Sequence, residues 1–214
     1  MSNPWNEIPL SDYEAHMGSA SIMQMQAING MMKVQLESFP VTEAMILGIA
    51  GGNGIEHIDD KKYRKIYGVD VNEKYLMKAE KRYGDCGGIL KYLHKDLLTE
   101  YAKLPYSELV IANLIIEYIG YNVFKKVIMQ VKPIYVSCAI QVNGESKEFI
   151  SNSVYASVFN GLEKIHHEID EKHLMKTMQE IKYQAKDKAE WVLPNGKKLL
   201  KVDFIKNPVI EIKE

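Results

Sequence analysis

The sequence predicts an α/β fold in which a doubly wound, mostly parallel sheet is covered by helices on both faces. Short apolar runs alternate with helix-like stretches through the middle of the chain, which is the pattern of strand–helix–strand units. Near the carboxyl end, two strand-like runs flank the turn sequence LPNG at 193–196. Such a pair forms a hairpin, so the sheet is expected to end in an antiparallel strand.

Five apolar runs are expected to form the parallel strands, over 44–50, 65–71, 89–96, 108–115 and 133–142. Helices are expected between them, over 54–60, 72–83 and 120–131. Apolar positions at helical spacing predict a helical insertion over about 150–181, with a break and restart at Asp170. Residues 1–40 are expected to form a helical lid segment around a methionine-rich helix at about 14–38, ahead of one domain over 41–214.

Composition narrows the class of protein. The chain has 27 basic and 28 acidic residues and a net charge of -1, so it lacks the basic field that nucleic-acid binding requires. No apolar run reaches the ~18 residues of a membrane helix, and the acidic, proline-broken start is not expected to be a signal peptide. Cys86 and Cys138 lack metal-ligand spacing and are expected to be reduced thiols of a cytoplasmic protein. His166 and His167 are expected on the solvent face of a helix, with no metal.

A glycine-rich loop follows the first predicted strand, in the stretch ILGIAGGNG at 46–54. Gly51, Gly52 and Gly54 leave backbone N–H groups free of side chains, which permits close approach of a ligand. The alternative is that the three glycines form a plain tight turn between strand and helix.

Polar residues close the next three predicted strands: Asp70 in YGVDVN, Asp96 in LHKDLL and Asn113 in VIANLI. An acid about 20 residues past a glycine loop suits the two hydroxyls of a ribose. Each acid alone also fits a helix N-cap. Because parallel strands deliver their carboxyl ends to one edge of the sheet, the set predicts a ligand site there.

The loop does not have the spacing of two common nucleotide sites. The NAD-type fingerprint needs glycines at i, i+2 and i+5, and no start within 48–54 meets it. The phosphate loop of NTPases needs GxxxxGK followed by Ser or Thr, which the sequence does not contain.

These stretches together resemble the motifs of the class I S-adenosylmethionine-dependent methyltransferases, over roughly residues 44–142. The resemblance implies a Rossmann-like sheet of seven strands with an antiparallel last strand. It implies S-adenosylmethionine as the cofactor, with Asp70 on the ribose, Asp96 at the adenine amino group and Leu97 giving a backbone contact. The cofactor-binding residues it implies are Ala50, Gly51, Gly52, Asn53, Gly54, Asp70, Val71, Asp96, Leu97 and Asn113.

Two positions depart from the family pattern. The acid of the first motif falls at Gly48, and its first glycine falls at Ala50. A small residue at position 50 still permits close approach, and Asn53 is a candidate for the missing polar contact.

Candidates for the substrate side are Tyr13, Glu117 and Tyr118. Glu117 suits a base or a partner for a substrate cation; alternatively it is the first-turn acid of a helix. Tyr118 is alternatively a packing residue. Tyr13 and His16 would lie over the active site if the N-terminal segment folds as a lid; the alternative, preferred for His16, is an ordinary surface helix. Methyl transfer is an in-line displacement that depends on positioning, so the lack of a nucleophilic triad or a metal cluster is no objection.

The sequence therefore predicts a methyltransferase acting on a small-molecule acceptor, without nucleic-acid or membrane partners. Two alternatives stay open: a binding protein that keeps the fold without turnover, and a nucleotide-dependent oxidoreductase. The helices at 150–181 are expected either to wall a small pocket or to form the surface of a homodimer.

Overall fold

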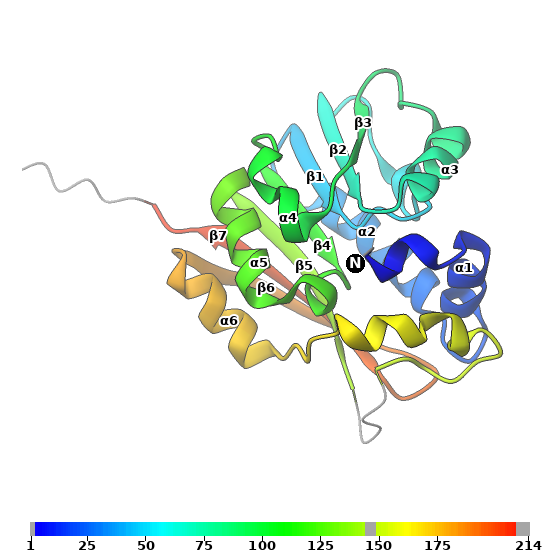
Figure 1. Ribbon diagram of the computed structural model, residues 1–214. Helices are drawn as coiled ribbons and strands as arrows, with labels where there is room; N and C mark the ends of the chain where they lie inside the picture. Colours follow the sequence, from blue (N-terminus) through cyan, green and yellow to red (C-terminus); the bar gives the residue numbers. More distant parts are fainter. Residues whose placement is uncertain (1–2, 144–148, 209–214) are drawn as a thin grey trace, which may run out of the picture.

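The computed structural model describes residues 3–143 and 149–208. A seven-stranded sheet of order β3-β2-β1-β4-β5-β7-β6 forms its centre (Figure 1). The strands are β1 Glu43–Leu47, β2 Lys65–Asp70, β3 Leu90–His94, β4 Leu109–Asn113, β5 Tyr135–Val142, β6 Tyr183–Val192 and β7 Lys198–Lys206. β7 runs antiparallel to both β5 and β6, and the remaining pairs are parallel. This confirms the predicted fold, including the hairpin.

Both faces of the sheet are buried, which explains why its central strands are apolar along their whole length. In β1, Met45 and Leu47 join one core cluster while Ala44 and Ile46 join the other. Helices α4 (Leu97–Glu100), α5 (Ile116–Val131) and α6 (Glu171–Glu180) pack into the first cluster, and α2 (Gln24–Glu37) and α3 (Glu73–Tyr83) into the second.

The N-terminal region contains two helices where one was predicted over about 14–38. Helix α1 covers Leu10–Gly18 and α2 covers Gln24–Glu37, after a short 3-10 helix η1 at Pro4–Glu7. The chain becomes extended at Ser19 and left-handed at Met23, with φ 51°. These two residues end one helix and turn the chain into the next.

The predicted helix over 54–60 is wrong. Only a single 3-10 turn, η2 at Ile55–His57, follows the glycine loop. Helix α2 supplies the cover on this face instead: Met32 and Leu36 pack in the same cluster as Ile46 and Ile66. A helix from the far N-terminus therefore occupies the layer that the sequence pattern assigned to the next segment.

Helix α5 begins earlier than the predicted residue 120 and is interrupted there. Gly120 has φ 68° and ψ 165°, outside the helical region. The positive φ favours glycine here, and a Cβ atom at this position would make a tight contact, 3.1 Å from the ring of His167. Residues 116–119 consequently form a separate first turn, which carries Glu117 and Tyr118.

The insertion over 150–181 restarts at Asp170 as predicted, but its first helix is of the 3-10 type. This helix, η4, covers Ala156–Lys164, and Asp170 then caps α6 by accepting a hydrogen bond from His173 N at 2.9 Å. His166 and His167 lie in the linker between η4 and α6 rather than on a helix. The half-buried His166 stacks on Phe149, with ring centroids 4.0 Å apart.

Strand β6 forms one outer edge of the sheet. Its exposed positions carry alternating charges in the stretch KDKAE at 186–190. The pairing with β7 shifts register between Ala185 and Asp187, which is a β-bulge. Lys188 pairs with Glu171 of α6 at 2.6 Å.

Two further expectations concern the chain as a whole. Within residues 3–143 and 149–208, no helix is long and apolar enough to cross a membrane. Both cysteines are unpaired; Cys138 is buried and Cys86 is half-buried.

Candidate functional site

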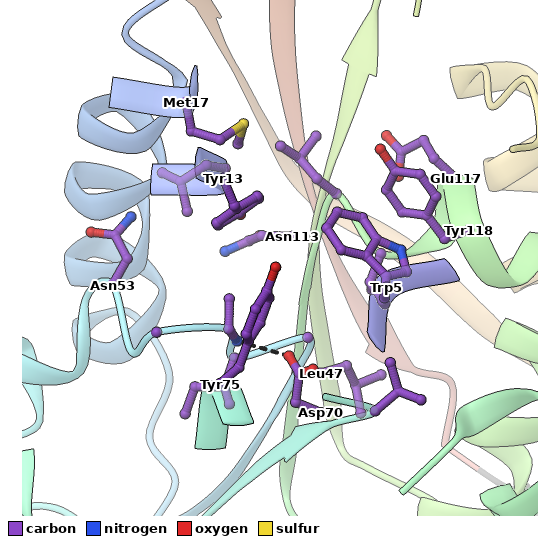
Figure 2. Close-up of a pocket in the computed structure, with 18 of the residues that line it drawn as sticks. Trp5, Tyr13, Met17, Leu47, Asn53, Asp70, Tyr75, Asn113, Glu117 and Tyr118 are labelled. Carbon is purple, nitrogen blue, oxygen red and sulfur yellow. Dashed lines mark hydrogen bonds between the residues drawn. The ribbon is translucent and has the colours of Figure 1, made fainter. Parts of the chain in front are cut away.

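A deep pocket opens where the loops after β1, β2, β3 and β4 meet, at the carboxyl ends of these strands (Figure 2). The sheet order reverses between β1 and β4, which is where open α/β sheets bind ligands. The empty space, counted with the solvent at its mouth, is about 1580 Å³. The predicted residues that line it are Tyr13, Ala50, Gly51, Asn53, Asp70, Val71, Asp96, Leu97, Asn113, Glu117 and Tyr118.

Gly52 and Gly54 do not line the pocket. Both have left-handed backbone, with φ +90° and +96°. A Cβ atom at Gly54 would lie 2.6 Å from Cβ of Met32, and one at Gly52 would lie 2.8 Å from side chains on both sides. These two glycines therefore make room for the protein's own side chains, not for a ligand.

Gly51 lines the pocket and also meets helix α1. A Cβ atom there would lie 2.5 Å from a carboxylate oxygen of Glu14 and 2.9 Å from Arg82 Nη1. Arg82 Nη2 donates to Glu14 Oε2 at 2.9 Å, and Arg82 Nη1 donates to the carbonyl of Gly51 at 3.3 Å. Arg82 Nη1 also donates to Glu14 Oε1, and this two-pronged ion pair holds α1 against the loop.

The amide of Asn53 is bonded to helix α2 through both of its ends. Asn53 Nδ2 donates to the carbonyl of Met25 at 2.9 Å, and Asn53 Oδ1 accepts from Asn29 at 2.9 Å. The side chain thus fixes the loop to α2, which leaves little capacity for the ligand contact suggested for it.

Ala50, at the family's first glycine position, has a left-handed backbone with φ 48°. Its N–H donates to Asp70 Oδ2 at 2.9 Å, and the N–H of Asn72 donates to Asp70 Oδ1 at 2.8 Å. Burial raises the pKa of Asp70 to about 6, against the lowering effect of these two bonds. Each carboxylate oxygen keeps a second lone pair, so Asp70 can accept hydrogen bonds from a diol in the pocket.

Asp96 has both of the roles considered for it. It caps α4 by accepting from the N–H of Leu98 at 2.9 Å, and it lines the pocket next to Leu97. Asn113, at the end of β4, is held by a second amide: Gln35 Nε2 donates to Asn113 Oδ1 at 2.9 Å, and Asn113 Nδ2 donates back to Gln35 Oε1 at 2.8 Å.

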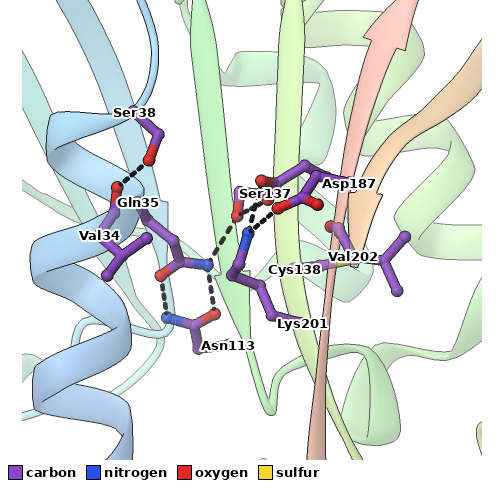
Figure 3. A network of polar contacts seen from close by, with 10 residues as sticks. Val34, Gln35, Ser38, Asn113, Ser137, Cys138, Asp187, Lys201 and Val202 are labelled. Carbon is purple, nitrogen blue, oxygen red and sulfur yellow. Dashed lines mark hydrogen bonds and ion pairs between the residues drawn. The ribbon is translucent and has the colours of Figure 1, made fainter. Parts of the chain in front are cut away.

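A buried polar network extends from this amide pair across the sheet (Figure 3). Gln35 also donates to Ser137 Oγ at 2.9 Å, and Ser137 Oγ donates to Asp203 Oδ1 at 2.6 Å. Lys201 Nζ completes it by donating to Asp203 Oδ2 at 2.5 Å. Both charged residues are at most 4% exposed, so the network depends on full pairing of its members. It fixes the end of β4 relative to β5, β7 and α2.

Glu117 is 6% exposed and lies in the first turn of α5. Its Oε1 accepts from the backbone N–H of Gln141 at 2.8 Å, while its Oε2 has no hydrogen-bond partner. Burial raises the pKa of Glu117 to about 7. Because an unpaired buried carboxylate oxygen is costly, this atom is available to bond a ligand.

Aromatic rings line the pocket near this acid (Figure 2). Trp5 meets Tyr118 edge-to-face, with centroids 4.9 Å apart and planes at 89°, and meets Tyr13 at 5.9 Å and 79°. Figure 2 shows Glu117, Tyr118 and Trp5 on one side of the pocket and Tyr13 across from them. Burial raises the pKa values of both tyrosines, which keeps them neutral. The indole Nε1 of Trp5 is buried without a hydrogen-bond partner.

The prediction that His16 lies on an ordinary surface helix is wrong. His16 is 3% exposed and lines the pocket, because the segment at 149–165 covers α1. Its Nδ1 forms a hydrogen bond with Ser153 Oγ at 2.7 Å. Burial, together with the nearby charge of Lys197, lowers the pKa of His16.

Several pocket residues were not identified from the sequence. They come from the N-terminal segment, from α2 and from the segment after β5, and include Trp5, Glu14, Met17, Gln24, Met25, Gln141, Phe149 and Phe159. The isolated aromatic residues in PWNEIPLSDYE were the available signal. Within the described part of the chain, no three His, Cys, Asp or Glu side chains gather as a metal site.

No family model matches the sequence, and no curated protein matches it. Solved structures do match the fold. Magnesium protoporphyrin IX methyltransferase (ChlM) from Synechocystis PCC 6803, with bound SAH, has a TM-score of 0.67 at 11% identity, over 96% of this chain and 98% of the other.

Two further structures give similar values. The N-methyltransferase NodS from Bradyrhizobium japonicum WM9, in complex with S-adenosyl-l-homocysteine, has a TM-score of 0.63 at 11% identity, over 93% of this chain and 98% of the other. The [4+2]-cyclase SpnF has a TM-score of 0.64 at 8% identity, over 88% and 84%. At these identities the likeness concerns the fold: this chain has the Rossmann-like fold of the class I S-adenosylmethionine-dependent methyltransferases.

Proposed function

We propose that this protein is an S-adenosylmethionine-dependent methyltransferase that acts on a small-molecule acceptor. One observation carries the proposal: the ends of four successive parallel strands line a single pocket, with the carboxylate of Asp70 at the end of the second. The pocket size, the fold and the neighbours crystallised with SAM or SAH support it.

The residues present fit the cofactor. Asp70 would hold the ribose hydroxyls with the lone pairs that its backbone bonds leave over. Asp96 and Leu97 would meet the adenine, and the backbone of Gly48 to Gly51 would run beside the amino-acid end, in place of the family's acid. When bound, the cofactor supplies an activated methyl group on a sulfonium. The protein's own task is then to orient the acceptor and exclude water.

The small-molecule acceptor is supported by charge and by shape. The chain has a net charge of -1, which is unfavourable for a polyanionic substrate. The segments 3–18 and 149–165 line the pocket alongside the strand ends, so protein side chains bound it on several sides.

Calorimetric titration with S-adenosylhomocysteine, S-adenosylmethionine and NADH tests this proposal. Both sulfur compounds are expected to bind, and Asp70→Ala should weaken them roughly tenfold to hundredfold, as expected for lost hydrogen bonds to a charged group. The matched control is Asp60→Ala, which removes an exposed acid and should leave affinity unchanged. No binding of either sulfur compound, or unchanged affinity in Asp70→Ala, would contradict the proposal.

A second candidate is a protein that binds the sulfur cofactor without transferring its methyl group. The departures at Gly48 and Ala50 favour it, and the fold is shared with a neighbour named as a [4+2]-cyclase. Binding of S-adenosylmethionine without transfer of a labelled methyl group to any acceptor class would support this candidate. Binding of NADH alone would instead indicate an oxidoreductase.

A further inference from the structure

The acceptor side of the pocket has an acid with an unused bonding position. Glu117 is 6% exposed, and its Oε2 lies buried without a hydrogen-bond partner in a pocket-lining residue. Its other oxygen is already held by Gln141 N, so the side chain is oriented and not free to turn to solvent. A ligand that donates a hydrogen bond would remove the cost of this unpaired atom.

The rings beside this acid favour a positive charge. We call a set of five aromatic residues that line this pocket the aromatic lobe: Trp5, Tyr13, Tyr118, Phe149 and Phe159. The planes of Trp5 and its two tyrosine neighbours are nearly perpendicular, so ring faces point in different directions around the lobe. Aromatic faces attract cations within about 6 Å, and they do so more strongly where water is excluded.

No cation of the described residues is paired with this acid; the nearby Lys197 Nζ instead donates to the carbonyl of Phe149 at 3.0 Å. Among the described residues, no Lys, Arg or His forms an ion pair with Glu117. The effects on its carboxyl group come from burial, from the N–H of Gln141 and from its own backbone. The buried acid therefore lacks a counter-charge that a cationic ligand would provide.

We propose that the aromatic lobe and Glu117 bind the methyl acceptor through a basic nitrogen, so that the acceptor is a small amine on an apolar carbon skeleton. This inference rests on the proposed function and specifies its substrate class. Alcohols of the same skeleton lack the charge that the lobe selects. The apolar side chains of Phe149, Phe159 and Ile165 would contact the skeleton.

Methyl transfer to this nitrogen begins with a proton transfer to Glu117. The ammonium N–H transfers its proton to the carboxylate of Glu117, which leaves a neutral amine. The nitrogen lone pair then forms a bond to the methyl carbon, and the bond from that carbon to sulfur breaks. Its electron pair stays on sulfur, which becomes a neutral thioether, while the methylated nitrogen carries the positive charge. The pKa of Glu117, about 7, suits a group that takes up a proton near neutral pH.

The experiment measures binding to protein saturated with S-adenosylhomocysteine, so that no turnover occurs. The probes are apolar primary and secondary amines, each paired with the alcohol of the same carbon skeleton, beginning with 2-phenylethylamine and 2-phenylethanol. Phenylethyl trimethylammonium, a permanent cation without N–H groups, separates attraction to the rings from hydrogen bonding to the acid. We expect amines to bind at least roughly tenfold more tightly than their alcohols.

Variants of Glu117 and Trp5 test whether these residues cause the preference for amines. Glu117→Gln keeps the shape and the bond from Gln141 and removes the charge, so the preference for amines should fall to within about threefold. Glu190→Gln, which removes an exposed acid paired with Lys198, is the matched control and should keep the full preference. If Glu117→Gln does not fold, Trp5→Leu serves instead: it should weaken the trimethylammonium probe about fivefold or more, and Trp5→Phe should retain most of its binding.

The outcomes separate the two proposals. If S-adenosylhomocysteine binds but amines and alcohols bind equally throughout the panel, the amine inference is overturned and the proposed function stands. Equal preference in the wild type and in Glu117→Gln overturns the role of the acid. If S-adenosylhomocysteine itself does not bind, both fall together. Transfer of a labelled methyl group to nitrogen, identified by mass spectrometry of the product, would support the inference independently.

Discussion

Replacing Glu117 by glutamine is expected to stabilise the folded protein at neutral pH. Burial raises the pKa of this carboxyl group from 4.5 to about 7 in the folded state. At about 1.4 kcal/mol per pH unit, the difference corresponds to about 3 kcal/mol. Between these two values the folded protein holds a proton that the unfolded chain has released, so the free energy of unfolding falls as pH rises. Above the folded-state pKa the full penalty is present.

Glutamine is neutral at every pH and resembles the protonated acid in shape. The variant and the wild type should therefore be similar in stability at about pH 4, below the unfolded-state pKa, and diverge as pH rises, with the variant about 1 to 3 kcal/mol more stable at about pH 8. Asp70, whose pKa is also raised to about 6, gives a slope of the same sign in both proteins and cancels in the comparison.

Urea unfolding of both proteins across this pH range, without ligand, measures the effect. Glu190→Gln is the control, because its acid is exposed and should give no pH-dependent gain. A stability difference that stays constant with pH, or one that favours the wild type at about pH 8, would refute the reasoning. It would mean that Glu117 is ionised at low cost in the folded protein.

Three other predictions concern packing and backbone. Lys201→Met should destabilise by about 3–5 kcal/mol because Asp203 is left buried without its ion pair, whereas Lys198→Met on the surface should cost less than about 1 kcal/mol in urea titrations. Ala50→Gly relieves a left-handed backbone and should change the free energy of unfolding by less than about 1 kcal/mol, toward stability; a larger loss would contradict the strain. Gly54→Ala should destabilise by about 2 kcal/mol, since its Cβ would meet α2, and an unchanged melting temperature would show that α2 can shift.

The strand ends were predictable because each carries a local signal. Asp70, Asp96 and Asn113 each follow an apolar run, and the parallel arrangement of β2, β3 and β4 brings them to one edge. The hairpin around LPNG was predictable for the same reason: the turn residues stand beside the strands they join. Short-range sequence patterns were therefore sufficient to predict the strand ends and the hairpin.

The cover of the pocket was not predictable in the same way. His16 reaches Ser153, which lies 137 positions further along the chain, and Gln35 reaches Asn113 and Ser137. Polar residues on a helix normally indicate a solvated face, and only the tertiary partner reveals that they are buried. The sequence therefore indicated where a cofactor would lie and predicted a lid segment over 1–40, but it did not indicate which side chains of the covering segments line the pocket.

The glycines show how a correct motif can have a different physical reason. The spacing of Gly52 and Gly54 matched the family pattern, and close approach of a ligand was the expected cause. In the structure Met32, Ile55 and Tyr83 occupy the space beside these two glycines. The motif located the loop, while Met32 of α2 explains Gly54, and Ile55 and Tyr83 explain Gly52.

The bulged, charged edge strand β6 limits how copies of this protein can associate. A partner strand placed along KDKAE would meet charges of both signs and a backbone whose register shifts at Asp187. Such edges resist the addition of further strands and protect a sheet from unlimited growth into aggregates. If the chain forms the homodimer considered from its sequence, we expect the contact to use helices and not a continuous intermolecular sheet through β6.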